Sequence, residues 1–199
     1  MTKTFEFFFD LGSPYSYLAA TQIDGLEKRH NIECIWRPIL LGGLFKQVDN
    51  KSPFYATSTN KKAHLLSDLT SWADYYAVPF KLPSCFPPNT LMAMRGAVVA
   101  NKMGLLTRYT HEMFRAYFVE DRDISEVEVL TDTLEKMALN SAEFCSELVT
   151  TDVKQTLIEN TQEAERRGAF GVPTFFYDQR MFFGNDRIVL LEDLLNRRA

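Results

Sequence analysis

Hydrophobic and polar positions alternate with a period of two near both ends of the chain, a pattern that predicts β-strands. The run KTFEFFFDLG at 3–12 places alternate phenylalanines on one face, and IECIWRPIL at 32–40 is rich in β-branched and aromatic residues. GVPTFFYDQRMFFG at 171–184 reads as two short strands that turn at Asp178–Gln179. The sequence therefore predicts two strands near each end.

In the rest of the chain, apolar positions recur every three or four residues, which is the spacing of amphipathic helices. The first predicted helix spans 13–31, with Ser13 as its N-cap, Pro14 in its first turn and cations at 28–30 in its last turn. Further helices are predicted at 65–76, 91–102, 109–119, 125–138, 150–168 and 185–198.

Helix ends and loops are marked by their own residue types. Gly168 suits the stop of the helix that begins at Thr150, and Asn185 or Asp186 suits the cap of the last helix. The segments 40–62 and 78–89 carry glycines, prolines and polar residues, and they predict loops.

The order of predicted elements is β-α-β, several helices, then β-β-α. A β-α-β unit calls for a right-handed crossover and a parallel pair of strands. The two ends of the chain together predict a four-stranded α/β layer, and the middle predicts a helical insertion that contributes no strand.

Composition and charge limit the kinds of partner that the chain is expected to bind. The chain has 199 residues, 46% hydrophobic and 24% charged, with a net charge of -4, so it can form a sizeable core and lacks a nucleic-acid footprint. Its three cysteines are odd in number and far apart, which argues against disulfides and for a reducing compartment. No signal peptide or membrane span is evident. We expect a cytoplasmic protein without nucleic-acid, membrane or metal partners.

Three motifs carry a family resemblance: DLGSPYSY after the first strand, GVPTFF at the start of a late strand, and FFGNDR just after it. Together they resemble the group of 2-hydroxychromene-2-carboxylate isomerases and kappa-class glutathione transferases. The resemblance implies a thioredoxin-like fold with a mixed four-stranded sheet and an all-helical insertion of the DsbA or kappa type. The thioredoxin-like domain would comprise 1–45 and 166–199, and the insertion 46–165.

The same resemblance implies glutathione as cofactor. The segment SPYS holds serine at both positions where thioredoxin-like proteins usually carry Cys-x-x-Cys, so the sulfur must come from outside. The unsatisfied N–H groups of a helix N-terminus stabilise an anion, and the Ser13 hydroxyl would hydrogen-bond the glutathione thiolate. The alternative is that Ser13 is only an N-cap. Ser16 is expected to bond its own helix backbone.

Other glutathione contacts are also implied by the resemblance. The Val172–Pro173 bond would be cis and would turn the Val172 backbone toward the cysteinyl main chain of glutathione; the alternative is a trans proline at a strand start. The γ-glutamyl end would be held by the segment Phe183, Gly184, Asn185 and Asp186, whose polar members could instead only cap the last helix. Asn50 would contribute from the loop at 40–62.

For the second substrate we expect Lys46 and Phe86, with Lys62 as a competing candidate for the cationic contact and Arg37 as another. Each lysine could instead be a solvated surface residue. Phe86 falls where an aromatic substrate contact is expected by resemblance. Its neighbour Cys85 is interpreted as structural, because neither a second cysteine nor a helix N-terminus accompanies it.

We therefore predict an isomerase in aromatic compound catabolism, by resemblance a homodimer, whose substrate is a small aromatic pyruvate-like acid. Glutathione thiolate would add reversibly to the conjugated double bond of that acid. One alternative is a kappa-class transferase or peroxidase that acts on other electrophiles. A DsbA-type oxidoreductase is disfavoured because both serines lack sulfur, and a glutathione- or peptide-binding module is the non-enzyme alternative.

Overall fold

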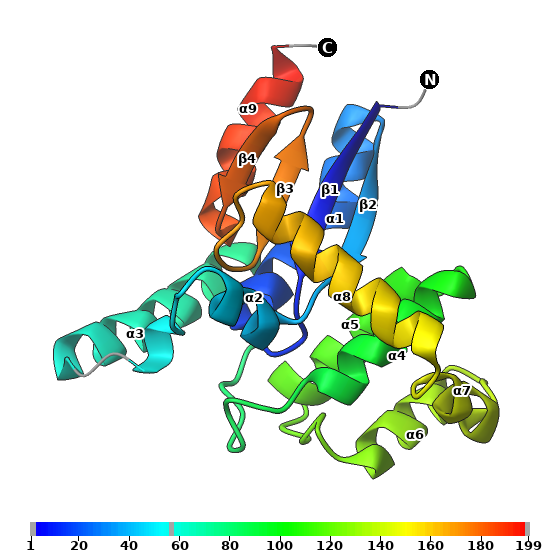
Figure 1. Ribbon diagram of the computed structural model, residues 1–199. Coiled ribbons are helices and arrows are strands. Elements are labelled where there is room, and N and C mark those ends of the chain that lie inside the picture. Colours follow the sequence, from blue (N-terminus) through cyan, green and yellow to red (C-terminus); the bar gives the residue numbers. More distant parts are fainter. Residues whose placement is uncertain (1–2, 56–57, 198–199) are drawn as a thin grey trace.

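The computed structural model describes residues 3–55 and 58–197 and contains a mixed sheet of four strands in the order β2-β1-β3-β4. Neighbours β1 and β2 run parallel, whereas β3 is antiparallel to β1 and to β4, as Figure 1 shows. The predicted α/β thioredoxin-like architecture is confirmed. The strands span Lys3–Phe9 (β1), Ile32–Pro38 (β2), Thr174–Tyr177 (β3) and Arg180–Phe183 (β4).

Helices from the two ends of the chain cover one face of the sheet, and two other helices cover the opposite face (Figure 1). The remaining helices form a helical part that shares its core with the sheet. The α-helices are α1 (Pro14–His30), α2 (Leu41–Gln47), α3 (Thr59–Tyr76), α4 (Leu91–Lys102), α5 (Leu106–Phe118), α6 (Val127–Lys136), α7 (Ser141–Glu147), α8 (Thr151–Arg166) and α9 (Ile188–Asn196). Two 3₁₀ turns are η1 (Pro53–Tyr55) and η2 (Asn185–Arg187).

Both faces of the sheet are buried. On one face Phe7 stacks on Phe175 with ring centroids 5.1 Å apart, and this face belongs to the large core shared with α1 and the helical part. On the other face Phe8 meets Phe176 edge-on at 5.4 Å, under α2 and α8. Fully burying such a side chain contributes roughly 1.5–3 kcal/mol, so the phenylalanine-rich strands account for a large part of the stability.

The junction between β1 and α1 forms as the sequence predicts. Ser13 is the N-cap of α1, and its hydroxyl oxygen accepts a hydrogen bond from the Ser16 N–H at 3.1 Å. Pro14 occupies the first turn, where its missing N–H costs nothing. Gly168 follows α8 with φ +90°, a conformation that favours glycine, and it ends that helix as predicted.

The prediction of a loop over 40–62 is wrong for its first part, which forms α2. Gly42 and Gly43 lower helix propensity, but tertiary contacts outweigh them. Leu44 is fully buried, and the Leu41 N–H at the start of the helix donates to the Asp10 carboxylate at 2.8 Å. The turn η1 and the start of α3 also lie within the predicted loop, and α7 was not predicted.

The predicted cap of the last helix is also wrong. Neither Asn185 nor Asp186 caps α9 with its side chain; both lie in the turn η2, and Arg187 is the N-cap residue. The proposed division into 1–45 with 166–199 and 46–165 stays a prediction. Within the described residues, no helix has the length and apolarity that crossing a membrane requires, and all three cysteines are free.

Candidate active site

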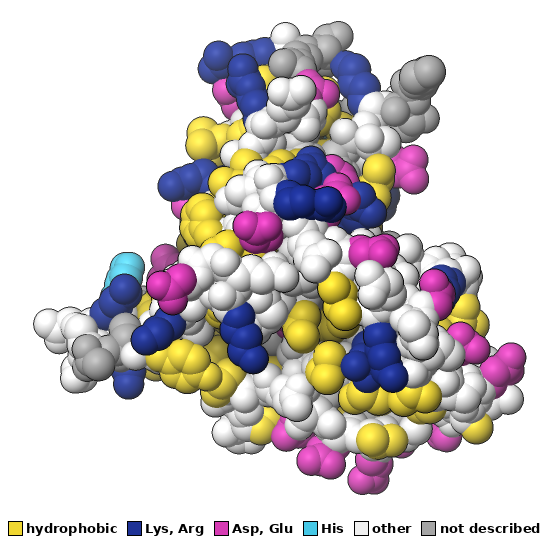
Figure 2. Space-filling model, viewed as in Figure 1, with side chains coloured by type: hydrophobic (Ala, Val, Ile, Leu, Met, Phe, Trp, Pro, Cys, Tyr) yellow, Lys and Arg dark blue, Asp and Glu magenta, His cyan; other side chains and the backbone are white. Residues whose placement is uncertain are grey.

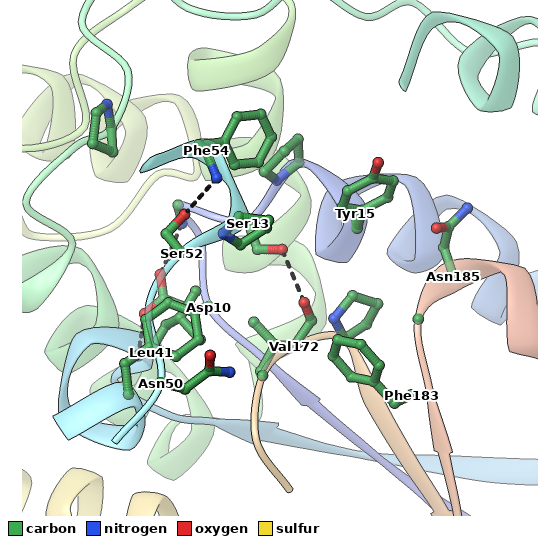
Figure 3. A pocket seen from close by; sticks show the side chains of 18 of the residues that line it. Asp10, Ser13, Tyr15, Leu41, Asn50, Ser52, Phe54, Val172, Phe183 and Asn185 are labelled. Atoms are coloured by element: carbon green, nitrogen blue, oxygen red, sulfur yellow. Dashed lines mark hydrogen bonds between the residues drawn. The ribbon is translucent and has the colours of Figure 1, made fainter. Parts of the chain in front are cut away.

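A cavity of about 840 Å³ opens where the sheet layer meets the helical part. Its lining comes from five separate segments, so it exists only in the folded chain. They are the β1–α1 junction, the stretch from α2 to η1, α3, the loop before α4, and the β3–β4 region with η2. Figure 3 shows side chains from most of these segments directed toward one space.

Ser13 lies in this cavity and is 5% exposed. Its hydroxyl accepts the Ser16 N–H and donates to the Val172 carbonyl oxygen at 3.3 Å, the dashed contact between Ser13 and Val172 in Figure 3. A hydroxyl oxygen at the N-terminus of a 17-residue helix stands beside unsatisfied N–H donors and the positive end of the helix dipole. Ser13 is therefore both the N-cap and a polar group available to an anion.

Val172 and Pro173 form the adjoining edge of the cavity, and their peptide bond is cis. The Pro173 carbonyl accepts the Gly184 N–H at 2.9 Å, which ties this edge to the end of β4. Among the described residues, no acceptor bonds the Val172 N–H. The main chain at Val172 thus offers an unused donor beside Ser13.

Gly184, Asn185 and Asp186 form the next part of the wall. Gly184 has φ +104°, a backbone conformation that favours glycine and is strained for residues with a side chain. Asn185 is 2% exposed, and its Nδ2 atom finds no hydrogen-bond partner in the described chain. A buried amide without a partner is costly, and it marks a place where a ligand would supply the acceptor.

Two carboxylates stand near this wall, Asp186 from η2 and Asp68 from α3. The Tyr15 hydroxyl donates to Asp68 Oδ2 at 2.7 Å, linking α1 to α3 across the cavity. Burial, and then the hydrogen bond to Asp68, raise the pKa of Tyr15, so its phenol stays protonated. Asp186 is already paired with Arg187, which also lines the cavity, so Asp68 is the carboxylate of this corner that lacks an ion pair in the described chain and suits a cationic group.

Asp10 lies at the floor of the cavity and is 1% exposed. Its carboxylate accepts hydrogen bonds from the Gly12 N–H, the Leu41 N–H and the Thr90 hydroxyl at 2.8, 2.8 and 3.2 Å. Burial raises the pKa of Asp10, against the effect of these three donors. Because the donors come from three different segments, Asp10 fixes their relative positions beneath Ser13.

The opposite wall is aromatic and open to solvent. Phe54 meets Phe86 edge-on with ring centroids 4.8 Å apart, and Trp72 of α3 also lines the cavity. Lys51 and Lys61 line it as exposed cations without an ion pair in the described chain. Figure 2 shows cationic side chains beside hydrophobic ones over α2 and α3. This wall suits an aromatic group that carries negative charge.

The cavity gathers most of the residues that the sequence singled out. It includes Ser13, Asn50, Phe86, Val172, Pro173, Phe183, Gly184, Asn185 and Asp186. Asn50 donates to the Phe170 carbonyl at 2.9 Å, so its amide already has one partner. Lys46, Lys62 and Arg37 do not line the cavity; Lys46 and Lys62 are exposed, and Arg37 pairs with Glu6 at 3.0 Å.

Sequence reasoning missed several lining residues. The lining lysines are Lys51 and Lys61 rather than Lys46 and Lys62, because the packing of α3 and of the chain after α2, not the spacing along the sequence, decides which side chain faces the cavity. Asp10 had a usable signal, a carboxylate at the end of a buried apolar strand. Cys85 does not line the cavity, and burial raises the pKa of its thiol, in keeping with a structural role.

Comparison with known proteins gives consistent matches along the whole chain. A family model described as a DSBA-like thioredoxin domain matches residues 4–196. The 2-hydroxychromene-2-carboxylate isomerase of Sphingobium xenophagum is 30% identical, covering 98% of this chain and 99% of its own. Glutathione S-transferase kappa 1 of Rattus norvegicus is 30% identical, and the match covers 98% of this chain and 92% of the transferase. The solved structure of a 2-hydroxychromene-2-carboxylate isomerase gives a TM-score of 0.88 at 26% identity, and the match covers 98% of this chain and 95% of that structure.

Proposed function

This chain belongs to the DSBA-like thioredoxin domain family, in the enzyme group of 2-hydroxychromene-2-carboxylate isomerases and kappa-class glutathione transferases, and we propose that it is a glutathione-dependent isomerase of a conjugated aromatic acid. The observation that carries the proposal is the Ser13 hydroxyl at a helix N-terminus inside the cavity, where no cysteine stands. A site of this kind can stabilise a thiolate but cannot form a disulfide.

The unsatisfied groups of the cavity fit glutathione. Its cysteinyl main chain would bond the free Val172 N–H in the manner of an added strand. Its γ-glutamyl carboxylate would accept from Asn185 Nδ2, which lacks a partner among the described residues. Its ammonium group would pair with Asp68 and with Asp186, which it would share with Arg187. With these contacts, the cysteinyl sulfur would lie on the Ser13 side.

Bound glutathione would supply a thiolate for reversible addition to the conjugated double bond, which would allow rotation about that bond before the thiolate is released. Ser13 and the N-terminus of α1 favour the charged form of the sulfur, which has an unperturbed pKa of about 8.5. Asp10 accepts hydrogen bonds from the β1–α1 junction, from the start of α2 and from Thr90 just before α4, and it thereby fixes the position of Ser13 relative to these segments. No residue changes its oxidation state.

The aromatic wall would bind the second substrate. Phe54 and Phe86 supply apolar faces for its ring, and Lys51 and Lys61 supply positive charge for its carboxylate and for the charge that develops on its pyruvyl oxygen. These lysines take the part first assigned to Lys46 or Lys62. The homodimer and the cytoplasmic location stay predictions.

Turnover of 2-hydroxychromene-2-carboxylate with and without glutathione tests the proposal. We expect isomerisation that requires glutathione, returns it unchanged, and leaves no product bound to sulfur. Activity that is unaffected by omission of glutathione would contradict the proposal. Insulin reduction should be absent, because Ser13 and Ser16 lack the sulfurs that disulfide exchange needs.

A kappa-class transferase activity is the second candidate, because the kappa 1 relative matches at the same 30% identity as the isomerase relative. The same wall of Val172, Asn185 and Asp186 would hold glutathione in both cases. Assays with halogenated aromatic electrophiles separate the two, since a transferase leaves a stable glutathione conjugate and an isomerase does not.

A further inference from the structure

The Ser13 hydroxyl has one proton, and the structure shows where that proton is directed. Its oxygen accepts the Ser16 N–H, and its O–H donates to the Val172 carbonyl 3.3 Å away (Figure 3). A sulfur placed beside Ser13 in this arrangement meets oxygen lone pairs rather than a proton. Since lone pairs repel a thiolate, Ser13 opposes deprotonation of the ligand's thiol for as long as the Ser13 hydroxyl donates to the Val172 carbonyl.

The contact to Val172 is a weak one. Hydrogen bonds between a hydroxyl and an oxygen acceptor usually measure about 2.7–2.8 Å, so 3.3 Å is long. Ser13 and Val172 are nevertheless buried, 5% and 8% exposed, so the carbonyl cannot be left without a donor at no cost. The hydroxyl is therefore released easily only when another donor reaches the Val172 carbonyl.

We propose that the Val172 carbonyl controls Ser13: when a ligand amide N–H bonds this carbonyl, the Ser13 hydroxyl turns from it and donates to the ligand's sulfur. This inference rests on the proposed function, because it concerns a thiol ligand in the same cavity. The Val172 carbonyl keeps one donor throughout. The hydroxyl exchanges a long neutral hydrogen bond for a charge-assisted one, which is the stronger type. The thiol proton passes to solvent.

The exchange makes the site selective for a chemical class of thiol. In an N-acyl cysteinyl residue, the amide N–H is on the carbon next to the one that carries the sulfur. Only a thiol with this arrangement can donate to the Val172 carbonyl and at the same time present its sulfur to Ser13. A thiol without that N–H leaves the hydroxyl on Val172, even where its other groups are bound equally well. Recognition of the main chain and activation of the sulfur are thus a single event.

A depsipeptide of glutathione tests this directly. In this analogue the cysteinyl N–H is replaced by an ester oxygen, while the thiol and both ends of the molecule are unchanged. The dissociation constant is measured by calorimetry, and the acidity of the bound thiol is measured from thiolate ultraviolet absorbance against pH. We expect the analogue to bind within several-fold of glutathione, because Ser13 still satisfies Val172. Its bound thiol should have an acid dissociation constant about tenfold smaller, one pKa unit.

Two variants complete the experiment. In Ser13→Ala the two ligands should show the same thiol acidity. In Ser16→Ala, which removes a hydroxyl that has no partner among the described residues, the difference should persist. Equal acidity of both bound thiols in the unaltered protein would overturn the inference, as would a difference that survives in Ser13→Ala. If glutathione itself gains no acidity on binding, the proposed function fails, and this inference fails with it.

Discussion

The two walls of the cavity recognise their ligands by different means. The wall around Ser13, Val172 and Asn185 consists of buried groups, many of them backbone atoms or helix-end positions of the thioredoxin-like layer. The wall around Phe54, Phe86 and Lys61 consists of side chains on α3 and on loops, partly or fully exposed. The first wall offers fixed donors and acceptors, and the second offers an apolar surface with mobile charges.

This difference assigns thiol chemistry to one wall and substrate choice to the other. Backbone groups change little when side chains are substituted, so the first wall suits a ligand of constant chemistry such as a thiol peptide. Side chains on the second wall lie outside the strands, and its aromatic residues are only partly buried at the edge of the core, so their replacement should disturb the sheet less. We therefore expect substitutions on the first wall to alter thiol chemistry and those on the second to alter substrate choice.

The largest effect is expected on the first wall, for Ser13→Ala. Loss of the Ser13 hydroxyl, the group proposed to donate to the bound sulfur, should raise the pKa of glutathione in the complex by about one unit or more and lower turnover about ten- to hundredfold near neutral pH. The measurements are thiolate absorbance and kcat. Ser16→Ala in the same turn serves as the control, and an equal loss there would show that the turn itself is damaged.

A substitution on the second wall, Phe86→Ala, should act on the other substrate. It removes the edge-to-face contact with Phe54, of the kind worth roughly 0.5–1.5 kcal/mol, together with part of the apolar surface. We expect KM for the aromatic acid to rise about tenfold, while the dissociation constant of glutathione stays within a factor of about two. A comparable weakening of glutathione binding would remove the distinction between the walls.

The lysines allow a matched test of charge on the second wall. Lys61 lines the cavity and its neighbour Lys62 does not, although both are exposed on α3. Lys61→Gln should raise KM for an anionic substrate a few-fold at low salt, because exposed charges contribute up to about 1 kcal/mol and are screened by ions. Lys62→Gln should leave KM unchanged at every salt concentration. An equal response would indicate a diffuse field rather than a site.

The smallest effect is expected outside the cavity, where helix α5 of the helical part packs against strand β2 of the sheet. His111 of α5 packs edge-on against Trp36 of β2 with ring centroids 5.5 Å apart. Burial lowers the pKa of His111, and Asp24 and Glu112 oppose this only in part. Since the unfolded chain takes up the proton at about pH 6.5, the free energy of unfolding should decrease as pH falls from there toward the lower folded pKa.

This decrease should be on the order of 1 kcal/mol for each unit of pKa difference, and none of it should arise above about pH 7.5. Urea unfolding midpoints at pH values on both sides of this window provide the measurement. His111→Gln should have a flatter pH dependence in the same window. A dependence as steep as that of the unaltered chain would assign the effect to other groups.

The sequence by itself determined the order of the strands and of all the helices except α2 and α7, the cap at Ser13 and the stop at Gly168. Each depends on local periodicity or on a single residue's backbone preference, which the chain carries wherever it folds. The motifs SPYS, GVP and GND also identified most of the first wall, because backbone-based sites need particular residues at fixed offsets from a strand or helix end.

Only the tertiary structure decided the rest. The helix α2 forms despite two glycines because Asp10 accepts the Leu41 N–H from another segment and because Leu44 is buried. Which lysine lines the cavity, Lys61 or Lys62, depends on which face of α3 the packing of the chain turns toward it. Side-chain walls are assembled from segments far apart in the chain, and their geometry is set by packing, which local sequence does not encode.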